Sequence, residues 1–334
     1  MDVTSALRQQ FGDRLRENEP LHRHTNFRIG GPARWYIEAR TLADVVFAVE
    51  TAAKAGVRRT VIGGGSNVLA SDEGFSGIVI QMAIRDIRID RTFVIAGAGA
   101  ITAAVAKQAS DSGLSGLEWA IGLPGTVGGA IFGNAGCFGG EMKDVIQNVS
   151  VLEMTNPECR MTKLSNVDCV FGYRRSMFKE HPELVIVEAT LQLTLGDVAT
   201  SRARMEEILA RRKSRQPLEH SSAGCVFANV EERDLDAAQR ERLDATTEGE
   251  WRRMAHDGQI PVGWLIDRAG CKGLRVGEAM TSERHGNFIV NLGQATAADV
   301  VALIAAVRAR VLERFGVELH EEVRRIGINP PDNA

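Results

Sequence analysis

The segment SSAGCVFAN, residues 221–229, places a single cysteine among small residues, shortly after a basic cluster that ends at Arg215. A thiol in this setting has three chemical options: a nucleophile, an inert buried group or a proton donor. The other four cysteines show neither C-x-x-C spacing nor histidines at metal-ligand spacing: Cys137, Cys159, Cys169 and Cys271. We therefore expect reduced thiols and no metal site, with a small buried side chain as the default for each cysteine.

A glycine loop, GGGSN at residues 63–67, follows the short β-branched run at 60–62. It lacks the G-x-G-x-x-G spacing of dinucleotide sites, and it is not a Walker A loop because no Gly-Lys-Ser/Thr follows. Consecutive glycines after a strand can turn several backbone N–H groups toward one point, which suits a pyrophosphate. A plain tight turn is the alternative.

A second glycine-rich stretch runs from Gly122 to Gly140. Turns alone do not explain so little side-chain bulk, so we expect this backbone to lie against a flat or extended partner. Pro124 would fix the path of the chain, and Thr126 and Asn134 could offer hydrogen bonds to a heteroaromatic edge.

The composition describes an ordinary globular protein: 334 residues, 44% hydrophobic and 25% charged. This length favours two or three domains, which leaves room for a cleft. A net charge of −3 gives no overall basic field of the kind that nucleic-acid binders use. The N-terminal residues do not resemble a secretory signal, and the apolar runs are far shorter than a membrane span. We expect a cytoplasmic protein with neither nucleic acid nor membrane as partner.

Two capping boxes predict helices. Thr41 and Asp44 begin an amphipathic segment that stops at Gly56, and Thr296 and Asp299 begin another that ends before Gly316. The core face of the second helix would carry Val300, Ile304, Val307 and Val311. A further helix with a basic last turn is expected over 201–213.

Strand patterns occupy residues 60–62, 77–82, 92–96 and 187–195, and the last of these alternates apolar and polar residues. A short strand is expected at 321–328. The change from strand to helix near 196–201 favours a domain boundary there.

Six motifs follow one another over residues 21–328. They are HTNFRIGGP at 24–32, GGGSN at 63–67, the stretch 122–140, YRRS at 173–176, SAGC at 222–225 and EVRRIG at 322–327. In this order they resemble the MurB family of peptidoglycan-precursor enzymes, the UDP-N-acetylenolpyruvoylglucosamine reductases.

The resemblance implies an α+β fold, with a two-lobed FAD-binding domain of the vanillyl-alcohol-oxidase/PCMH type and a C-terminal α+β substrate domain. We expect the lobes at 1–82 and 83–198 and the substrate domain at 199–316, with a C-terminal strand at 317–328 that can return to the first lobe. FAD would be held noncovalently, its pyrophosphate on residues 63–67 and its flavin along the second glycine stretch. The implied cofactor contacts are Arg28, Gly63, Gly64, Gly65, Ser66, Asn67, Gly122, Pro124, Gly125, Thr126, Gly128, Gly129 and Asn134.

The resemblance also implies a reaction. Members of the family oxidise NADPH and reduce the enolpyruvyl ether of UDP-N-acetylglucosamine to the lactyl ether of UDP-N-acetylmuramate, with hydride from N5 of the FAD. The partners would then be small molecules, the UDP-sugar ether and NADPH, and we expect a monomer or a weak homodimer.

To reduce a vinyl ether that carries a carboxylate, the protein must stabilise the negative charge of the enediolate and donate a proton to the carbon alpha to the carboxylate. Arg174 suits the first, because a guanidinium grips both carboxylate oxygens. Glu322 matches the family's catalytic glutamate and would act protonated or hydrogen-bonded, whereas Glu321 would face the other way. Cys225 stands where many members have serine, and a thiol of pKa about 8.5 is mostly protonated at pH 7. Nearby positive charge would lower that pKa unless the substrate's phosphates occupy it.

The segment after Cys225 departs from the family's Phe-Lys-Asn-Pro pattern, because Ala228 stands in place of the lysine. The resemblance therefore does not extend to the phosphate or carboxylate contact that this lysine implies. Five residues remain as substrate contacts, with Arg215 the candidate for the diphosphate: Tyr173, Arg215, Asn229, His285 and Asn287. A surface charge at Arg215 and a hydrogen-bonded structural histidine at 285 are the alternatives.

Two other functions stay open on the residues alone. A different flavin oxidoreductase of the same superfamily would share the glycine loops, which report the cofactor and not the chemistry. A family paralogue that binds nucleotide sugar or flavin without turnover would show changes such as Cys225 and Ala228. The set Arg174, Cys225 and Glu322 favours the reductase.

Overall fold

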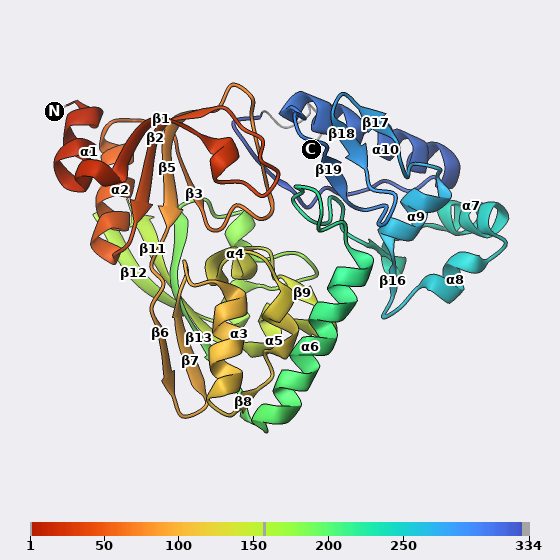
Figure 1. The fold of residues 1–334 in the computed structure, drawn as a ribbon, viewed down its shortest axis with the longest axis horizontal. Coiled ribbons are helices and arrows are strands. Elements are labelled where there is room, and N and C mark those ends of the chain that lie inside the picture. The colour runs from red at the N-terminus through yellow and green to blue at the C-terminus, as the bar shows by residue number, and fades with distance from the viewer. Residues whose placement is uncertain (1, 156–157, 329–334) are drawn as a thin grey trace. The chain divides into compact units, whose positions relative to one another are not determined.

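The computed structural model describes residues 2–155 and 158–328, and the chain folds into two units (Figure 1). Unit 1 comprises Met1–Glu19, Pro32–Gly65 and Phe75–Ser214, and unit 2 comprises Pro20–Gly31, Ser66–Gly74 and Arg215–Ala334. Helices and strands occur in both units, as the α+β prediction requires. Each unit has its own hydrophobic core.

Unit 1 contains a four-stranded sheet in the order β1 (Leu15–Pro20), β2 (Pro32–Ala39), β5 (Phe75–Met82) and β3 (Arg59–Ile62). Strand β5 pairs in parallel with both of its neighbours, β2 and β3. Helix α2 (Leu42–Lys54) packs on β2 and β5, and α1 (Val3–Phe11) packs on α2. The predicted capping box begins α2, because the Asp44 N–H donates to the Thr41 hydroxyl at 3.1 Å.

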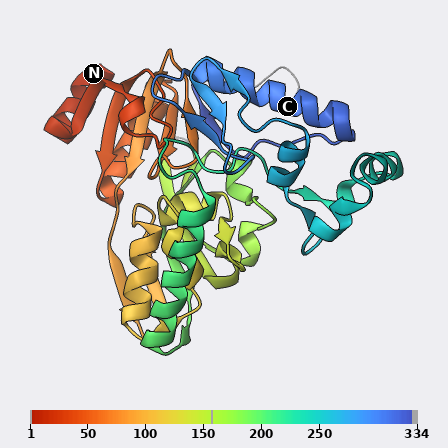
Figure 2. The same cartoon turned by 45° about the vertical axis from the view of Figure 1, so that its right-hand side comes forward.

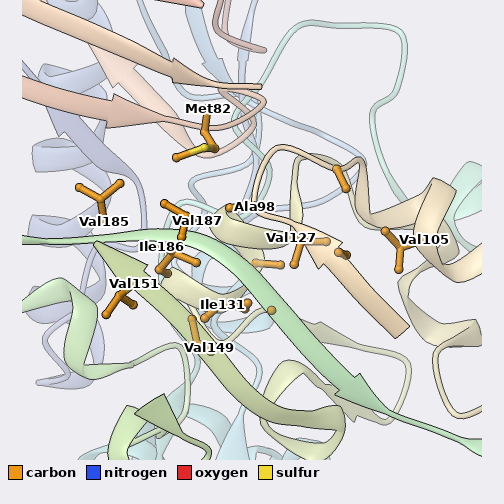
Figure 3. Packing of buried hydrophobic residues seen from close by; sticks show 14 of the residues in the cluster. Met82, Ala98, Val105, Val127, Ile131, Val149, Val151, Val185, Ile186 and Val187 are labelled. Carbon is orange, nitrogen blue, oxygen red and sulfur yellow. The ribbon is translucent and has the colours of Figure 1, made fainter. Parts of the chain in front are cut away.

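A five-stranded antiparallel sheet forms the rest of the unit 1 framework. Its order is β12 (Glu158–Ser165), β11 (Ile146–Thr155), β13 (Leu184–Gln192), β7 (Phe93–Gly97) and β6 (Ile87–Asp90). The short helix α4 (Val127–Phe132) packs on this sheet, and Figure 3 shows its Val127 and Ile131 among Val149 and Val187. The second glycine stretch is therefore fixed to a buried core.

Helices α3 (Thr102–Asp111) and α6 (Val198–Arg215) lie side by side in both ribbon views (Figures 1 and 2). An ion pair of 2.8 Å joins Asp111 of α3 to Arg202 of α6. The predicted helix at 201–213 is thus present and longer at both ends. Because α6 up to Ser214 clusters with unit 1, the division between the units follows this helix.

Unit 2 is built on a three-stranded antiparallel sheet and the long helix α10 (Ala297–Phe315) beside it (Figure 1). The strands are β17 (Arg275–Val276), β18 (Ala279–Thr281) and β19 (Ile289–Asn291). The predicted capping box at Thr296 is present, and the four predicted core residues of the helix are buried. The other elements of this half are α7 (Ala237–Thr247), α8 (Glu250–Met254), α9 (Val262–Arg268), β15 (Val230–Glu231) and β16 (Gln259–Ile260).

The strand expected at 321–328 is shorter than predicted: β20 (Arg324–Ile326) pairs in parallel with β4 (Val68–Ala70). Although β4 lies within residues 1–82, it clusters with unit 2. The smaller elements of unit 1 are two strand pairs and a short helix: β8 (Leu114–Ser115) with β14 (Thr194–Leu195), β9 (Gly136–Cys137) with β10 (Gly140–Glu141), and α5 (Met142–Val145). Among the described residues, no helix is long and apolar enough to cross a membrane.

Candidate active site

The two glycine-rich segments meet within unit 1. The loop that begins at Gly63 follows β3 directly, and a Cβ added at Gly63 would lie 2.2 Å from Oγ1 of Thr126. A Cβ at Gly64 would lie 3.0 Å from the Cα of Gly125. Only glycine allows the two segments to approach this closely.

The backbone of the second segment is held by a run of small residues after β7. The N–H groups of Val127 and Gly128 donate to the carbonyls of Ala100 and Ala98 at 2.9 Å each. Sequence reasoning missed this supporting segment. The alternation of alanine and glycine at residues 96–100 was its only signal.

Several glycines of the second stretch make room for protein atoms. A Cβ at Gly122 would lie 2.3 Å from Cδ of Arg212, and one at Gly128 would lie 2.8 Å from the Cβ of Ala98. At Gly140 it would lie 2.3 Å from Cδ1 of Trp119. Internal packing therefore accounts for part of the glycine content that sequence analysis attributed to an extended partner.

The turn that carries Arg174 also belongs to unit 1. Gly172 and Arg175 exchange backbone hydrogen bonds of 2.9 and 3.1 Å, so Tyr173 and Arg174 form the tip between them. The Arg174 guanidinium donates to the carbonyl of Gly136 at 2.9 Å and lies 5.4 Å from the ring centroid of Tyr173. Its side chain is half-buried, which limits screening of its charge by solvent.

Unit 2 brings Cys225 and Glu322 onto neighbouring segments. The Glu322 N–H donates to the carbonyl of Val226 at 2.8 Å, one residue from Cys225. On the other side of this segment, the Val226 N–H donates to the carbonyl of Asn287 at 2.9 Å. Cys225 itself is half-buried.

The last residue of the first glycine loop is tied to the same place. The side chain of Asn67 donates to the carbonyl of Glu322 at 3.0 Å, and the Arg324 N–H donates to the carbonyl of Asn67 at 3.1 Å. Glu321 is paired with Arg325 through two bonds of 2.9 and 2.6 Å. The ion pair with Arg325 engages both carboxylate oxygens of Glu321.

The sequence matches models of two families: an FAD binding domain over residues 33–165 and the C-terminal domain of UDP-N-acetylenolpyruvoylglucosamine reductase over residues 216–326. The curated reductase of Heliobacterium modesticaldum is 38% identical over 97% of this chain and 94% of its own length. The chain belongs to the UDP-N-acetylenolpyruvoylglucosamine reductase family. A second member, from Synechococcus sp. strain JA-3-3Ab, is also 38% identical, over 95% of this chain and 93% of its own.

The fold agrees with this family. The crystal structure of the MurB reductase from Thermus caldophilus superposes with a TM-score of 0.71 at 33% identity, covering 93% of this chain and 99% of that one. The predicted family, FAD-binding domain and C-terminal domain are therefore confirmed.

The residues where the two loops meet fit an FAD cofactor. Thr126 Oγ1 is buried, and no partner for it exists among residues 2–155 and 158–328. A hydroxyl in this state is costly unless a bound group completes its hydrogen bonding. Beside it, Gly64 and Gly129 are exposed. A Cβ at Gly129 would lie 3.7 Å from Thr126 Oγ1, its nearest described neighbour outside the adjacent residues and the backbone of its own helix. Gly65 and Gly125 have φ angles of 64° and 104°, which suit glycine in a tight, bare loop.

For the other predicted cofactor contacts, the structure gives the exposure and the backbone conformation but, among these described residues, no group that needs a ligand. Arg28 is an exposed residue with φ 54°, and Pro124 is exposed beside Gly125. Ser66 is half-buried in the first loop. Asn134 is fully buried, and the hydrogen bonds of its amide are to protein groups.

The predicted substrate contacts in unit 2 lie around the Cys225 segment. Asn287 is buried and clamps Phe227, with bonds of 2.9 Å to its N–H and 2.7 Å to its carbonyl. The Asn229 side chain bonds Gln259 and the N–H of Val262 at 3.3 and 3.1 Å. The side chains of Asn229 and Asn287 therefore hold the backbone around the Cys225 segment.

His285 stacks edge-on against Phe288 with ring centroids 4.9 Å apart. Burial lowers the pKa of His285, and the charges of Lys272 and Arg215 lower it further. The imidazole is thus neutral at pH 7. Arg215, although exposed, is near enough for its charge to disfavour protonation of His285.

Of the other four cysteines, Cys169 and Cys271 are buried as expected, whereas Cys137 and Cys159 are half-buried. Burial raises the pKa of Cys137, Cys159 and Cys271, and raises that of Cys169 to about 11. Their thiols remain protonated at pH 7, and the five cysteines form no disulfide within the described residues.

Proposed function

We propose that the protein is an NADPH-dependent flavoenzyme that reduces UDP-N-acetylglucosamine enolpyruvate to UDP-N-acetylmuramate for peptidoglycan precursor synthesis. The observation that carries the proposal is the junction in unit 2 between the Cys225 segment and Glu322, joined by the Glu322 N–H and the Val226 carbonyl. Membership of the reductase family over nearly the full chain supports the substrate.

FAD would be held by the first glycine loop and by Gly125, Thr126 and Gly129. When bound, it supplies hydride transfer, from NADPH to the flavin and from flavin N5 to the terminal carbon of the enolpyruvyl group. The protein's part is to bind the substrate, to stabilise the negative charge and to deliver a proton.

Arg174 binds the substrate carboxylate in this proposal. Its guanidinium stays charged throughout the reaction and meets the negative charge that grows on the carboxylate as the enediolate forms. The bond to the Gly136 carbonyl at 2.9 Å limits the orientations of the side chain, so less freedom is lost on binding.

Cys225 donates the proton to the α-carbon, and Glu322 stabilises the enol form beside it. The S–H bond breaks, a C–H bond forms at the α-carbon, and the thiolate then takes a proton from solvent, so no covalent intermediate arises. Glu322 acts in a protonated or hydrogen-bonded state, because a bare carboxylate would repel the enediolate.

The proposal is tested on the purified protein by its flavin spectrum and by NADPH oxidation with and without UDP-N-acetylglucosamine enolpyruvate. Oxidation that depends on the ether is the expected result. A flavin that NADPH reduces but the ether never reoxidises would assign the protein to another flavin oxidoreductase, and no redox change would assign it to a binding protein.

The donor role is tested with two replacements of Cys225. Serine can still donate a proton, so Cys225→Ser should keep much of the activity, while Cys225→Ala should lose about 100-fold or more in kcat. Cys159→Ala is the matched control, since its thiol lies in β12 of unit 1 and should be dispensable. Equal turnover in the wild type and both Cys225 variants would remove the cysteine from the mechanism.

A further inference from the structure

Three side-chain bonds join residues 132–136 to the turn that carries Arg174. Ser176 Oγ donates to the carbonyl of Phe132 at 2.7 Å, and Asn134 Nδ2 donates to that of Gly172 at 2.8 Å. The Arg174 guanidinium donates to the Gly136 carbonyl at 2.9 Å. Every second residue from 132 to 136 is therefore bonded to the segment 172–176, and Asn134 provides the central bond.

The hydrogen-bonding capacity of the Asn134 amide is used inside the protein. Its Nδ2 donates to the Gly172 carbonyl and to Glu141 Oε2 at 2.9 Å, and its Oδ1 accepts from the Lys143 N–H at 3.0 Å. The residue is completely buried, with a left-handed φ of 40° that asparagine tolerates better than most residues. Both amide hydrogens are engaged, so the side chain has no donor left for a ligand.

The turn itself needs such support. Arg174 has a left-handed φ of 52°, a conformation that costs a non-glycine residue free energy and persists only where its surroundings fix it. The Gly172 carbonyl, which Asn134 holds, also accepts the Arg175 N–H that closes the turn at 3.1 Å. The amide thus anchors the first residue of the turn while the Gly136 carbonyl anchors its guanidinium.

We propose that Asn134 is a positioning residue for Arg174: through the Gly172 carbonyl it holds the turn in the conformation that presents the guanidinium to the substrate carboxylate. This inference rests on the role of Arg174 in the proposed function. It moves Asn134 from the expected cofactor contacts to the machinery that orients the carboxylate-binding arginine.

The test compares two ligands that differ in the enolpyruvyl group, UDP-N-acetylglucosamine enolpyruvate and UDP-N-acetylglucosamine, by calorimetric titration of the oxidised holoenzyme. In Asn134→Gly, which keeps the left-handed backbone but removes the amide, affinity for the enolpyruvate should fall about ten-fold. Affinity for UDP-N-acetylglucosamine should not change. Asn166→Ala is the matched control, because its Nδ2 also donates to two carbonyls of unit 1, those of Lys143 and Ile146 at 2.7 Å.

A double-mutant cycle separates positioning from general destabilisation. Arg174→Ala should show the same selective loss, and adding Asn134→Gly to it should lower the affinity no further. If Asn134→Gly does not fold, Ser176→Ala removes the neighbouring bond and should give a smaller loss confined to the enolpyruvate. An equal loss for both ligands, or no loss, overturns the inference. A wild-type protein that fails to bind or reduce the enolpyruvate overturns the proposed function instead.

Discussion

At the scale of single residues, Thr126 is the predicted cofactor contact on which the packing bears most directly. Its hydroxyl lies against Gly63, is buried, and has no partner within the part of the chain that the structure describes. The sequence predicted Thr126 as a cofactor contact from its place in a glycine-rich stretch. The packing adds the physical reason, since protein atoms alone do not satisfy this oxygen.

Replacing Thr126 with valine should therefore separate folding from cofactor binding. Valine keeps the shape and removes the hydroxyl, so the apoprotein should be as stable as the wild type or more stable. Affinity for FAD should fall about five-fold, the equivalent of one hydrogen bond of about 1 kcal/mol. Thermal denaturation of the apoprotein and fluorescence titration with FAD measure the two effects.

Thr247→Val provides the control for this experiment. The Thr247 hydroxyl is buried and already donates to the Leu243 carbonyl at 2.6 Å, far along the chain in α7 of unit 2. Its loss should leave FAD affinity unchanged. A Thr126→Val apoprotein that melts well below the wild type would mean that the hydroxyl serves the protein and not the cofactor.

The sequence predicted residues that belong to local motifs, but it did not predict hydrogen bonds between residues far apart in the chain. Cys225 and Glu322 were predicted from motifs, and the structure places their segments side by side. The structural work of Asn134 and Asn287 could not be predicted, because it depends on carbonyl groups 38 and 60 residues away in the chain. A motif indicates that a side chain has a role, but it does not identify the group to which that side chain bonds.

At the scale of elements, the segment 66–74 contains the end of the first glycine loop and contacts the segment that carries Glu322. Its strand β4 pairs with β20 two residues after Glu322, and the Asp72 that follows caps helix α10. The capping box at Thr296 was predicted because its members are three residues apart. Asp72 was not, since it lies 225 positions from its partner Ala297.

Asp72→Ala should weaken unit 2 through the start of α10. The Asp72 carboxylate accepts the N–H groups of Ala297 and Ala298 at 2.8 and 3.1 Å, which would otherwise lack intrahelical partners. Loss of this contact should lower the free energy of unfolding by about 1 kcal/mol, as for other N-terminal caps. Urea denaturation followed by far-UV circular dichroism measures the change.

Glu73→Ala is the neighbouring control for the cap. The Glu73 N–H, not its side chain, makes the local bond to Ser71 Oγ, so this variant should unfold at the wild-type urea concentration. Equal stability of the Asp72→Ala protein and the wild type would show that the Asp72 carboxylate adds no stability beyond the capping box of Thr296 and Asp299.

At the scale of the whole molecule, the chain composes its units from pieces that are distant in sequence. Unit 2 takes Pro20–Gly31 and Ser66–Gly74 as well as the C-terminal third, so its core includes Phe27, Ile29 and Leu69. Strand and helix patterns could not reveal this, because they describe each segment and not its neighbours. The family model for the C-terminal domain, over residues 216–326, also stops short of these pieces.

A fragment that contains only residues 215–334 should therefore fail to fold cooperatively. It lacks Phe27, Ile29 and Leu69, which are almost fully buried in the core of unit 2, and it leaves β20 without its only described strand partner, β4. Loss of one such core side chain costs about 2 to 5 kcal/mol. The loss of three is therefore comparable to the whole free energy of unfolding of a typical domain, about 5 to 15 kcal/mol. Differential scanning calorimetry should show no sharp transition in the fragment and a clear one in the full chain, with Leu69→Ala lowering the latter. A cooperative transition in the isolated fragment would show that the two N-terminal segments are attached to a core that is complete without them.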